Sequence, residues 1–188
     1  MSDAVRGEDG RRRCPWAVST PDYVSYHDEE WGRRLTSDDA MFERLTLEGF
    51  QSGLSWLIIL RKRPGFRAAF ADFSIPKVAA FDDADAERLL NDAGIVRNRA
   101  KIAATMANAR AALELPGGIL AFVEGFAPTG RRAAPKRIGD LPAVSPESTA
   151  MSKALKRHGF RFVGPTTAYA LMQATGLVND HLADCWCR

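Results

Sequence analysis

Two pairs of metal-binding residue types stand far apart in this chain. Cys14 and His27 form the first pair, and His181 and Cys185 form the second. Neither pair completes a metal site, but together they supply two thiolates and two imidazoles, a common ligand set for tetrahedral zinc. If the pairs meet, the metal joins opposite ends of the chain, and the fold must bring both ends together. Cys187 is an alternative ligand, although the spacing favours Cys185.

The composition is that of one compact globular domain. The chain has 188 residues, of which 46% are hydrophobic, enough for a substantial core. No apolar run approaches the length of a membrane span and the first residues lack a signal-peptide core, so we expect a cytoplasmic protein. Three cysteines, two of them crowded together, are not typical of a secreted disulfide framework. We expect a monomer without an obligate protein partner, because no surplus apolar stripe demands one.

The spacing of apolar residues predicts an all-α fold. Ser37-Asp38-Asp39 predicts a helix start, and a helical segment over 54–60 is predicted to end at Pro64-Gly65. Asp83 is predicted to cap the helix that Gly94 ends. Further helices are predicted over 76–81, 101–115, 119–126, 147–158 and 165–175.

The remaining segments are predicted to be irregular. Residues 1–13 are polar, with three consecutive arginines, and are predicted to form a flexible basic tail. Residues 128–146 contain four prolines and are predicted to form a connector. Strands and internal repeats are not indicated. We therefore expect one helical domain over 14–188.

A short turn with a glycine at each end separates the last two predicted helices. It reads Gly159-Phe160-Arg161-Phe162-Val163-Gly164, and Lys153 and Lys156 lie just upstream. Backbone N–H groups and a helix N-terminus exposed at such a turn bind phosphate. Residues 148–179 also lack Asp and Glu, which favours a polyanionic partner. The simpler interpretation is an ordinary corner between two helices, and the pattern alone favours it.

Two segments, 23–32 and 47–56, concentrate aromatic and polar residues. Glu48, Ser52 and Trp56 recur at every fourth position and would share one face of a helix. A buried carboxylate on such a face is costly without a donor or a proton. The simpler interpretation, that Glu48 reaches solvent while Trp56 packs in the core, is favoured by these residues alone.

The motifs resemble one known family when they are taken together and in order. They are R-C-P-W at 13–16, Y-H-D-E-E-W-G at 26–32, L-E-G-F-Q-S-G-L-S-W at 47–56, D-A-G-I-V-R-N-R at 92–99, S-K-A-L-K-R-H-G-F-R-F-V-G at 152–164 and L-V-N-D-H at 177–181. This set strongly resembles the 3-methyladenine DNA glycosylase I family, bacterial alkylation-repair enzymes of the helix-hairpin-helix superfamily. The resemblance covers about Cys14 to Cys185.

The resemblance implies the fold, the metal and the partner. It implies a helix-hairpin-helix glycosylase fold with the hairpin at 159–164, and alkylated double-stranded DNA as the partner. A structural zinc would join both ends of the domain through Cys14, His27, His181 and Cys185. The residues implied to contact the DNA backbone are Gly159, Arg161, Gly164, Lys153 and Lys156.

The resemblance also implies a reaction, in which a damaged nucleotide is flipped out of the duplex and its N-glycosidic bond is hydrolysed. Glu48 would accept hydrogen bonds from the amino edge of 3-methyladenine and favour its positive charge. The aromatic residues implied to stack on the base are Trp16, Tyr26 and Trp56, with Tyr23 less certain. Asn179 stands where related glycosylases carry an aspartate, and no lysine is placed as a Schiff-base nucleophile, so we expect monofunctional hydrolysis without strand cleavage.

Two other functions compete with this interpretation. A protein that binds alkylated bases without cleaving them would keep the same hairpin and pocket. A zinc-stabilised adaptor between proteins would explain the metal ligands, but it would leave the basic stretch and Glu48 without a purpose. Salt-dependent binding to duplex DNA separates the adaptor from the other two functions.

Overall fold

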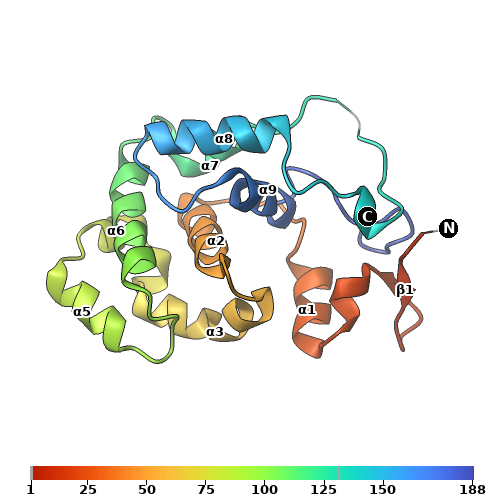
Figure 1. The fold of residues 1–188 in the computed structure, drawn as a ribbon, viewed down its shortest axis with the longest axis horizontal. Coiled ribbons are helices and arrows are strands. Elements are labelled where there is room, and N and C mark those ends of the chain that lie inside the picture. Colours follow the sequence, from red (N-terminus) through yellow and green to blue (C-terminus); the bar gives the residue numbers. More distant parts are fainter. Residues whose placement is uncertain (1, 131) are drawn as a thin grey trace.

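The computed structural model describes residues 2–130 and 132–188, and within them it confirms a mainly helical fold (Figure 1). The nine α-helices of this part of the chain are α1 Pro21–Glu29, α2 Asp38–Gln51, α3 Trp56–Ala69, α4 Ile75–Ala79, α5 Asp83–Asn91, α6 Arg99–Leu113, α7 Gly118–Glu124, α8 Pro146–Arg157 and α9 Pro165–Ala174. Short 3₁₀ turns lie at η1 Pro15–Val18, η2 Ala71–Phe73 and η3 Ile138–Asp140. None of the described helices is long and apolar enough to cross a membrane.

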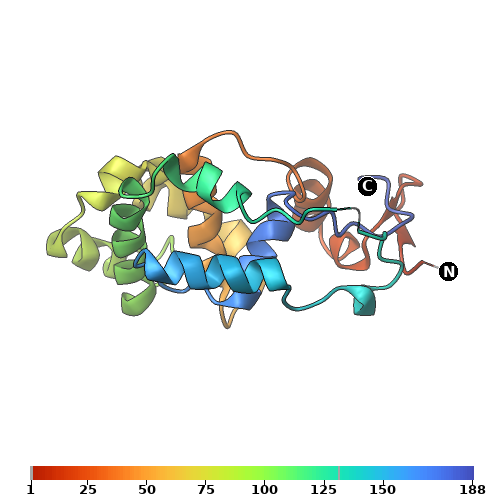
Figure 2. The same cartoon turned by 90° about the horizontal axis from the view of Figure 1, so that it is seen from above.

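Helix α2 lies at the centre of the molecule and supplies part of the hydrophobic core. It packs against α3, α6, α7 and α9, and α8 packs against α9. Its side chains Met41, Phe42, Leu45, Leu47 and Phe50 are all almost completely buried. The molecule is elongated, with α4 to α6 at one end and α1 at the other (Figures 1 and 2). Both chain termini lie at the α1 end in both views.

The helix starts follow the predicted capping residues closely. The Ser37 side chain accepts a hydrogen bond from the backbone N–H of Ala40, as expected for the N-cap of α2. At α5 the cap is Asp82, one residue before the predicted Asp83, because Asp82 and Asp85 form a reciprocal capping box. Short polar side chains therefore define where these helices begin.

The predicted helix end at Pro64-Gly65 is wrong. Helix α3 runs without a break from Trp56 to Ala69 and contains Pro64. The next residue in the helix, Gly65, packs closely against another segment: a Cβ atom there would lie only 2.5 Å from the carbonyl oxygen of Gly94. Gly65 therefore allows a close approach between two backbones, and tertiary packing outweighs the local tendency of proline to end a helix.

The predicted flexible tail and the absence of strands also differ from the structure. Strands β1 Val5–Arg6 and β2 Arg12–Arg13 pair in an antiparallel hairpin. Its last residue, Arg13, is buried and donates hydrogen bonds to the carboxylate of Asp28 in α1. Composition alone suggested a solvated basic segment, but the partner of Arg13 lies fifteen residues away and gave no local signal.

Candidate functional site

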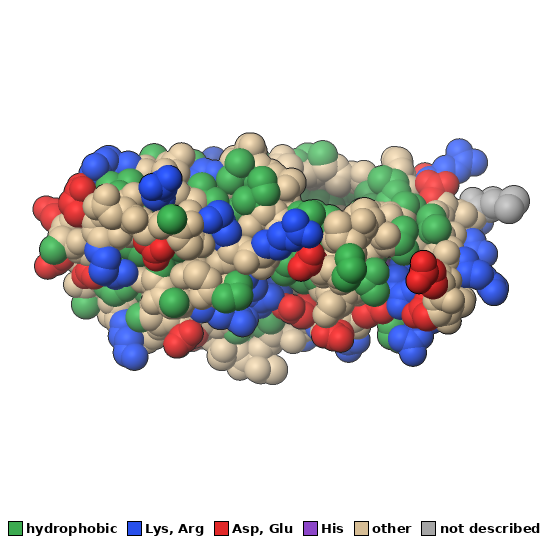
Figure 3. Space-filling model, turned by 90° about the horizontal axis from the view of Figure 1, so that it is seen from below, with side chains coloured by type: hydrophobic (Ala, Val, Ile, Leu, Met, Phe, Trp, Pro, Cys, Tyr) green, Lys and Arg blue, Asp and Glu red, His purple; other side chains and the backbone are tan. Residues whose placement is uncertain are grey.

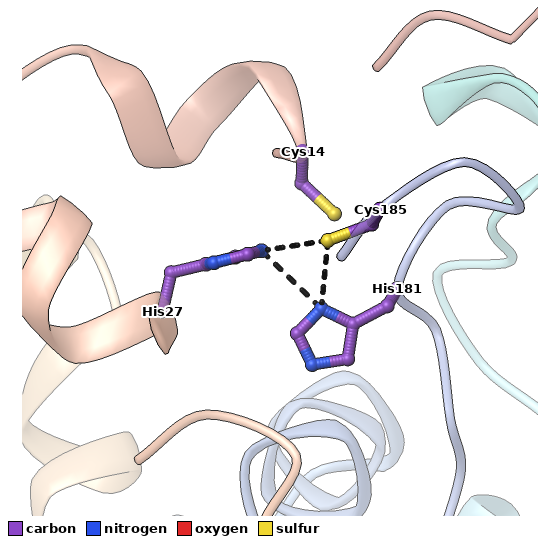
Figure 4. A group of neighbouring side chains, drawn as sticks. All are labelled: Cys14, His27, His181 and Cys185. Carbon is purple, nitrogen blue, oxygen red and sulfur yellow. Dashed lines mark hydrogen bonds between the residues drawn. The ribbon is translucent and has the colours of Figure 1, made fainter. Parts of the chain in front are cut away.

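The two Cys and His pairs meet beside α1. Cys14, His27, His181 and Cys185 are all buried, and one ligand atom of each lies within 4.8 Å of the others. Figure 4 shows the four side chains converging on a common centre. Nε2 of His27 lies 3.2 Å from Nδ1 of His181 and 3.4 Å from Sγ of Cys185. The same sulfur lies 3.6 Å from Nδ1 of His181.

These separations fit the ligands of a tetrahedral metal. Zinc bonds to nitrogen and sulfur of ~2.0–2.3 Å place neighbouring ligand atoms about 3.3–3.8 Å apart. The pKa of the Cys185 thiol lies well below its usual range because the Cys14 thiol and both imidazoles face it. Cys187 lies on the opposite side of His27, 3.7 Å from Nδ1, so its sulfur is outside the group of four.

A second layer of residues orients the His27 ring. Its Nδ1 atom lies 2.8 Å from Oδ1 of Asp28, which leaves Nε2 facing the other three ligands. Asp28 in turn accepts hydrogen bonds from Arg13 at 2.6–3.0 Å and from the indole of Trp186 at 3.2 Å. A carboxylate on the outer nitrogen of a histidine is the usual support for a metal ligand.

A cavity of about 420 Å³ lies next to this cluster. Its lining contains all five residues predicted for the base pocket, namely Trp16, Tyr23, Tyr26, Glu48 and Trp56. Three of these five precede His27 in the short segment that begins at Cys14. Two of the candidate metal ligands, Cys14 and His27, and one wall of the cavity therefore belong to the same piece of chain.

The aromatic rings form a connected wall. Trp16 meets Tyr23 edge to face with ring centroids 5.7 Å apart, and Tyr26 lies 5.3 Å from Trp56. The Tyr23 hydroxyl accepts a hydrogen bond from the backbone N–H of Leu57 at 3.0 Å, at the start of α3. The rings are therefore held in place both by each other and by the helix that supplies Trp56.

Among the described residues that line this cavity, Glu48 is the charged one. Its side chain is only 6% exposed, and burial raises its pKa to about 7, although the positive charge of Arg44 opposes that rise. No hydrogen bond from the described residues contributes to this shift. A buried carboxylate without a protein donor is available to a ligand that brings its own donors or a positive charge.

The predicted common helix face of Glu48, Ser52 and Trp56 is wrong. Helix α2 ends at Gln51, Ser52 is exposed, and Trp56 begins the next helix. Gly53 turns the chain between them with a φ of +81°, a conformation that favours glycine. Glu48 and Trp56 still line the same cavity, but they approach it from two helices.

Sequence reasoning missed several residues that line the cavity. Trp31 and Gln51 lie inside the two segments already singled out, and Gln51 follows Glu48 by one helical turn, so both had a local signal. Ile138 and Leu141 from the connector and Gln173 from α9 had none, because only the tertiary fold brings them to the cavity.

The turn between α8 and α9 has an exposed, specifically shaped backbone. Gly159 has a φ of +88° and Phe162 a φ of +55°. Phe160 is buried in the core, whereas the side chain of Phe162 is 42% exposed. Arg161 is exposed, as are Lys153 and Lys156 of the preceding helix. Gly164 is the N-cap of α9 and provides no side-chain cap.

Asn108 of α6 holds this turn by both edges of its amide. Its Oδ1 accepts from the backbone N–H of Arg161 at 2.8 Å, and its Nδ2 donates to the carbonyl oxygen of the same residue at 3.0 Å. Ser152 adds a hydrogen bond to the carbonyl oxygen of Val163 at 2.6 Å. The shape of the turn is therefore fixed by side chains outside it.

Replacing Asn108 by leucine is expected to destabilise the protein by about 1–3 kcal/mol, because two backbone groups of Arg161 lose their partner. Denaturant unfolding measures the loss. An unchanged free energy of unfolding would contradict the role of Asn108 in holding the turn.

Comparisons of sequence and of structure find relatives of one kind. A model described as methyladenine glycosylase matches residues 16–188. DNA-3-methyladenine glycosylase 1 of Escherichia coli (strain K12) is 45% identical over 181 residues, which cover 93% of this chain and 96% of that protein.

Solved structures extend the likeness to three dimensions. A crystal structure of 3-methyladenine DNA glycosylase I superposes with a TM-score of 0.89 at 43% identity and covers 94% of this chain and 99% of its own. A tyrosine-to-phenylalanine variant of such an enzyme in complex with 3-methyladenine gives a TM-score of 0.88 at 34% identity, with 93% and 96% covered.

Proposed function

Since this chain belongs to the methyladenine glycosylase family, we propose that it is a DNA glycosylase that removes 3-methyladenine from alkylated double-stranded DNA by hydrolysing the N-glycosidic bond. The observation that carries the proposal is the cavity in which a buried carboxylate, Glu48, lies among aromatic rings. The complex of a family member with 3-methyladenine supports the choice of base.

The cavity suits a cationic purine that has been flipped out of the duplex. Methylation at N3 gives adenine a positive charge and weakens its bond to the sugar. Trp16, Tyr26 and Trp56 offer ring faces that attract such a cation, and Tyr23 supports Trp16 from the side. A neutral adenine gains less from the same wall and keeps its stronger bond, so the charge of the lesion contributes to selectivity.

Glu48 gives the cavity its preference for adenine. As a carboxylate it accepts hydrogen bonds from the amino edge of the base and interacts favourably with the positive charge on the ring. Its burial makes both interactions stronger than they would be in water. Glu48 is therefore the catalytic residue we assign, since it would touch the base that leaves.

The reaction is proposed to be monofunctional. None of the described residues that line the cavity is a lysine, and the buried Lys101 donates to the carbonyl oxygens of Phe50 and Ser52. Asn179 is exposed and its Oδ1 accepts from the backbone N–H of His181, so it does not replace the aspartate of related glycosylases. The good leaving group then makes hydrolysis possible without a covalent intermediate on the enzyme.

We propose zinc as the metal of the Cys14, His27, His181 and Cys185 cluster. All four ligands come from the protein, so zinc would supply a structural cross-link and leave no open position for a reacting water. The cross-link would join both ends of a single domain over 14–188 and fix the segment that carries Trp16 and Tyr26.

Helices α8 and α9, with the turn between them, are proposed as the helix-hairpin-helix element that binds the DNA backbone. Gly159, Gly164 and Arg161 would contact phosphates through backbone N–H groups and one side chain. Figure 3 shows the face away from α8, on which Lys and Arg side chains are interspersed with Asp and Glu.

Replacing Lys153 or Lys156 by alanine is expected to weaken binding to every DNA sequence alike. Each variant should also reduce the slope of log affinity against log salt by about one, because one phosphate contact and its counterion are lost. Fluorescence anisotropy with duplex DNA at several salt concentrations measures both quantities. Lys77→Ala, an exposed lysine on α4, is the matched control and should leave the slope unchanged.

The activity itself is tested by chromatography of the bases that purified protein releases from methylated duplex DNA. Release of free 3-methyladenine with intact DNA strands supports the proposal. Borohydride-trapped enzyme–DNA adducts would contradict monofunctional hydrolysis. A folded, metal-loaded protein that binds methylated DNA but releases no base would leave the non-catalytic lesion binder in its place.

A further inference from the structure

A buried arginine lies on the core helix that carries Glu48. Arg44 of α2 is 3% exposed, and its helix neighbours Met41 and Leu45 are buried apolar side chains. Burying a guanidinium costs several kcal/mol unless its donors and its charge find partners. An aliphatic side chain at this position would pack against the core without that cost. The contacts of Arg44 show which role the charged side chain has there.

The guanidinium of Arg44 contacts the two aromatic residues that meet in the cavity. Nη1 donates to the Tyr26 hydroxyl at 2.7 Å, and the guanidinium carbon lies 5.3 Å from the centre of the Tyr26 ring and 5.8 Å from that of Trp56. Both rings also line the cavity. Arg44 thus holds Tyr26 by its hydroxyl and packs against both rings.

Arg44 is also the charge that faces Glu48. It precedes Glu48 by four residues, so the two side chains lie on the same side of α2. The groups that reach the cavity from the other elements, Tyr26 of α1, Trp56 of α3 and Gln173 of α9, are uncharged. Among the described residues, Arg44 supplies the charge that lowers the pKa of Glu48 against the effect of burial.

A network of ion pairs anchors Arg44 on its far side. Its Nη2 donates to Glu30 at 3.3 Å, and Glu30 also pairs with Arg63 of α3. Arg63 in turn pairs with Glu43 at 2.6 Å. Through Arg44 and its bond to Tyr26, the network joins α1, α2 and α3, the three helices that supply Tyr26, Glu48 and Trp56. Arg44 is the member of the network that contacts the aromatic rings of the cavity.

We propose that Arg44 is a positioning residue of the base pocket, which fixes Tyr26 through its hydroxyl and supplies the positive charge that keeps Glu48 a carboxylate when a base enters. This inference rests on the proposed function of the cavity. A protonated Glu48 would lose its negative charge and one acceptor, so a cationic base would be bound less well. The pH range of base excision is therefore set in part by Arg44.

The test compares Arg44→Met with Arg63→Met, a matched control that removes a cation bound to the same Glu30 but leaves the contacts of Arg44 with the Tyr26 and Trp56 rings in place. The pKa of Glu48 is measured by nuclear magnetic resonance of ¹³C-labelled carboxyl groups and assigned by the signal lost in Glu48→Gln. Single-turnover release of 3-methyladenine from methylated DNA is measured against pH for the same proteins.

Arg44→Met is expected to raise the pKa of Glu48 by about 1–3 units, since an adjacent cation is lost. The acid limb of the release rate should move to higher pH by the same amount, which lowers the rate at pH 7 at least about fivefold. Arg44→Lys should restore both values toward those of the parent. Arg63→Met loosens the anchor of Arg44 but keeps its guanidinium beside Tyr26 and Glu48, so it should shift both values much less than Arg44→Met.

Equal shifts in Arg44→Met and Arg63→Met, or no shift in either, would overturn the proposal. If Arg44→Met does not fold, Arg44→Gln keeps a donor for Tyr26 without the charge and is expected to show the same pKa rise. A parent protein that releases no base would refute the proposed function. The carboxyl titration would still decide in that case whether Arg44 controls the ionisation of Glu48.

Discussion

Glu48→Gln is expected to lower the single-turnover release of 3-methyladenine by about 10²–10³-fold, the usual loss when one buried charged hydrogen-bonding group is removed from a reacting centre. Glutamine has nearly the same shape but lacks the negative charge, and it accepts hydrogen bonds through only one oxygen. The cavity should therefore keep its form while it loses its attraction for a cationic base. Chromatography of released bases measures the loss.

The same substitution is expected to stabilise the protein at alkaline pH. The pKa of Glu48 is about 7 in the folded protein against an ordinary value of 4.5, so folding opposes its ionisation. Above pH 7, the full free-energy cost of ionising the buried Glu48 destabilises the folded protein. This destabilisation shrinks between pH 7 and 4.5, and it vanishes below pH 4.5. Glu48→Gln should exceed the parent in free energy of unfolding by up to about 3 kcal/mol at pH 8 and match it at pH 4.

Glu43→Gln is the control for both measurements. Glu43 is another carboxylate of α2, but it pairs with Arg63 and Arg67 instead of lining the cavity. Its replacement should leave base release unchanged and should not stabilise the protein at pH 8. Unchanged release by a folded Glu48→Gln would remove Glu48 from the site, whatever its effect on stability.

Removing the proposed zinc is expected to lower the melting temperature by about 8–16 °C. A link between His27 and His181 closes a loop that spans most of the chain, which is worth ~4 kcal/mol in loop-closure entropy alone. The free energy of metal binding adds to this, because the unfolded chain offers no preformed site. Calorimetry with and without a strong chelator, together with the zinc content of each sample, measures the effect.

Cys187→Ser distinguishes a specific ligand set from general thiol chemistry. The Cys187 sulfur lies beside Nδ1 of His27 and outside the group of four, so this variant should retain one zinc per chain and the parental melting temperature. Cys185→Ser should lose both. Full zinc content in Cys185→Ser would show that the four residues do not form the site.

The sequence allowed the metal ligands and the pocket residues to be predicted for different reasons. Cysteine and histidine are rare here and have specific chemistry, so their spacing alone suggested that Cys14 and His27 meet His181 and Cys185. The pocket residues came from a resemblance between ordered motifs. The helical spacing of Glu48, Ser52 and Trp56 gave a wrong prediction, because α2 ends before Trp56 and the chain turns at Gly53.

Features that depend on long-range partners gave no local pattern. Helix α3 continues through Pro64, and the adjacent Gly65 packs closely against Gly94, which lies far away in the sequence. The burial of Arg13 depends on Asp28. That of Arg44 depends on the Tyr26 hydroxyl in α1 and on the carboxylate of Glu30 just after that helix. In a single sequence, an arginine that is solvated and one that completes a buried network look the same.

The shared segment of metal site and cavity has a consequence for the order of assembly. Trp16, Tyr23 and Tyr26 leave the ribosome early, but the cluster that fixes their segment requires His181 and Cys185, which are synthesised more than a hundred residues later. Contacts of such long sequence separation form late in folding. An incomplete nascent chain would therefore hold its aromatic residues without a closed pocket, and competence for damaged bases would arise only after nearly all of the domain has been translated.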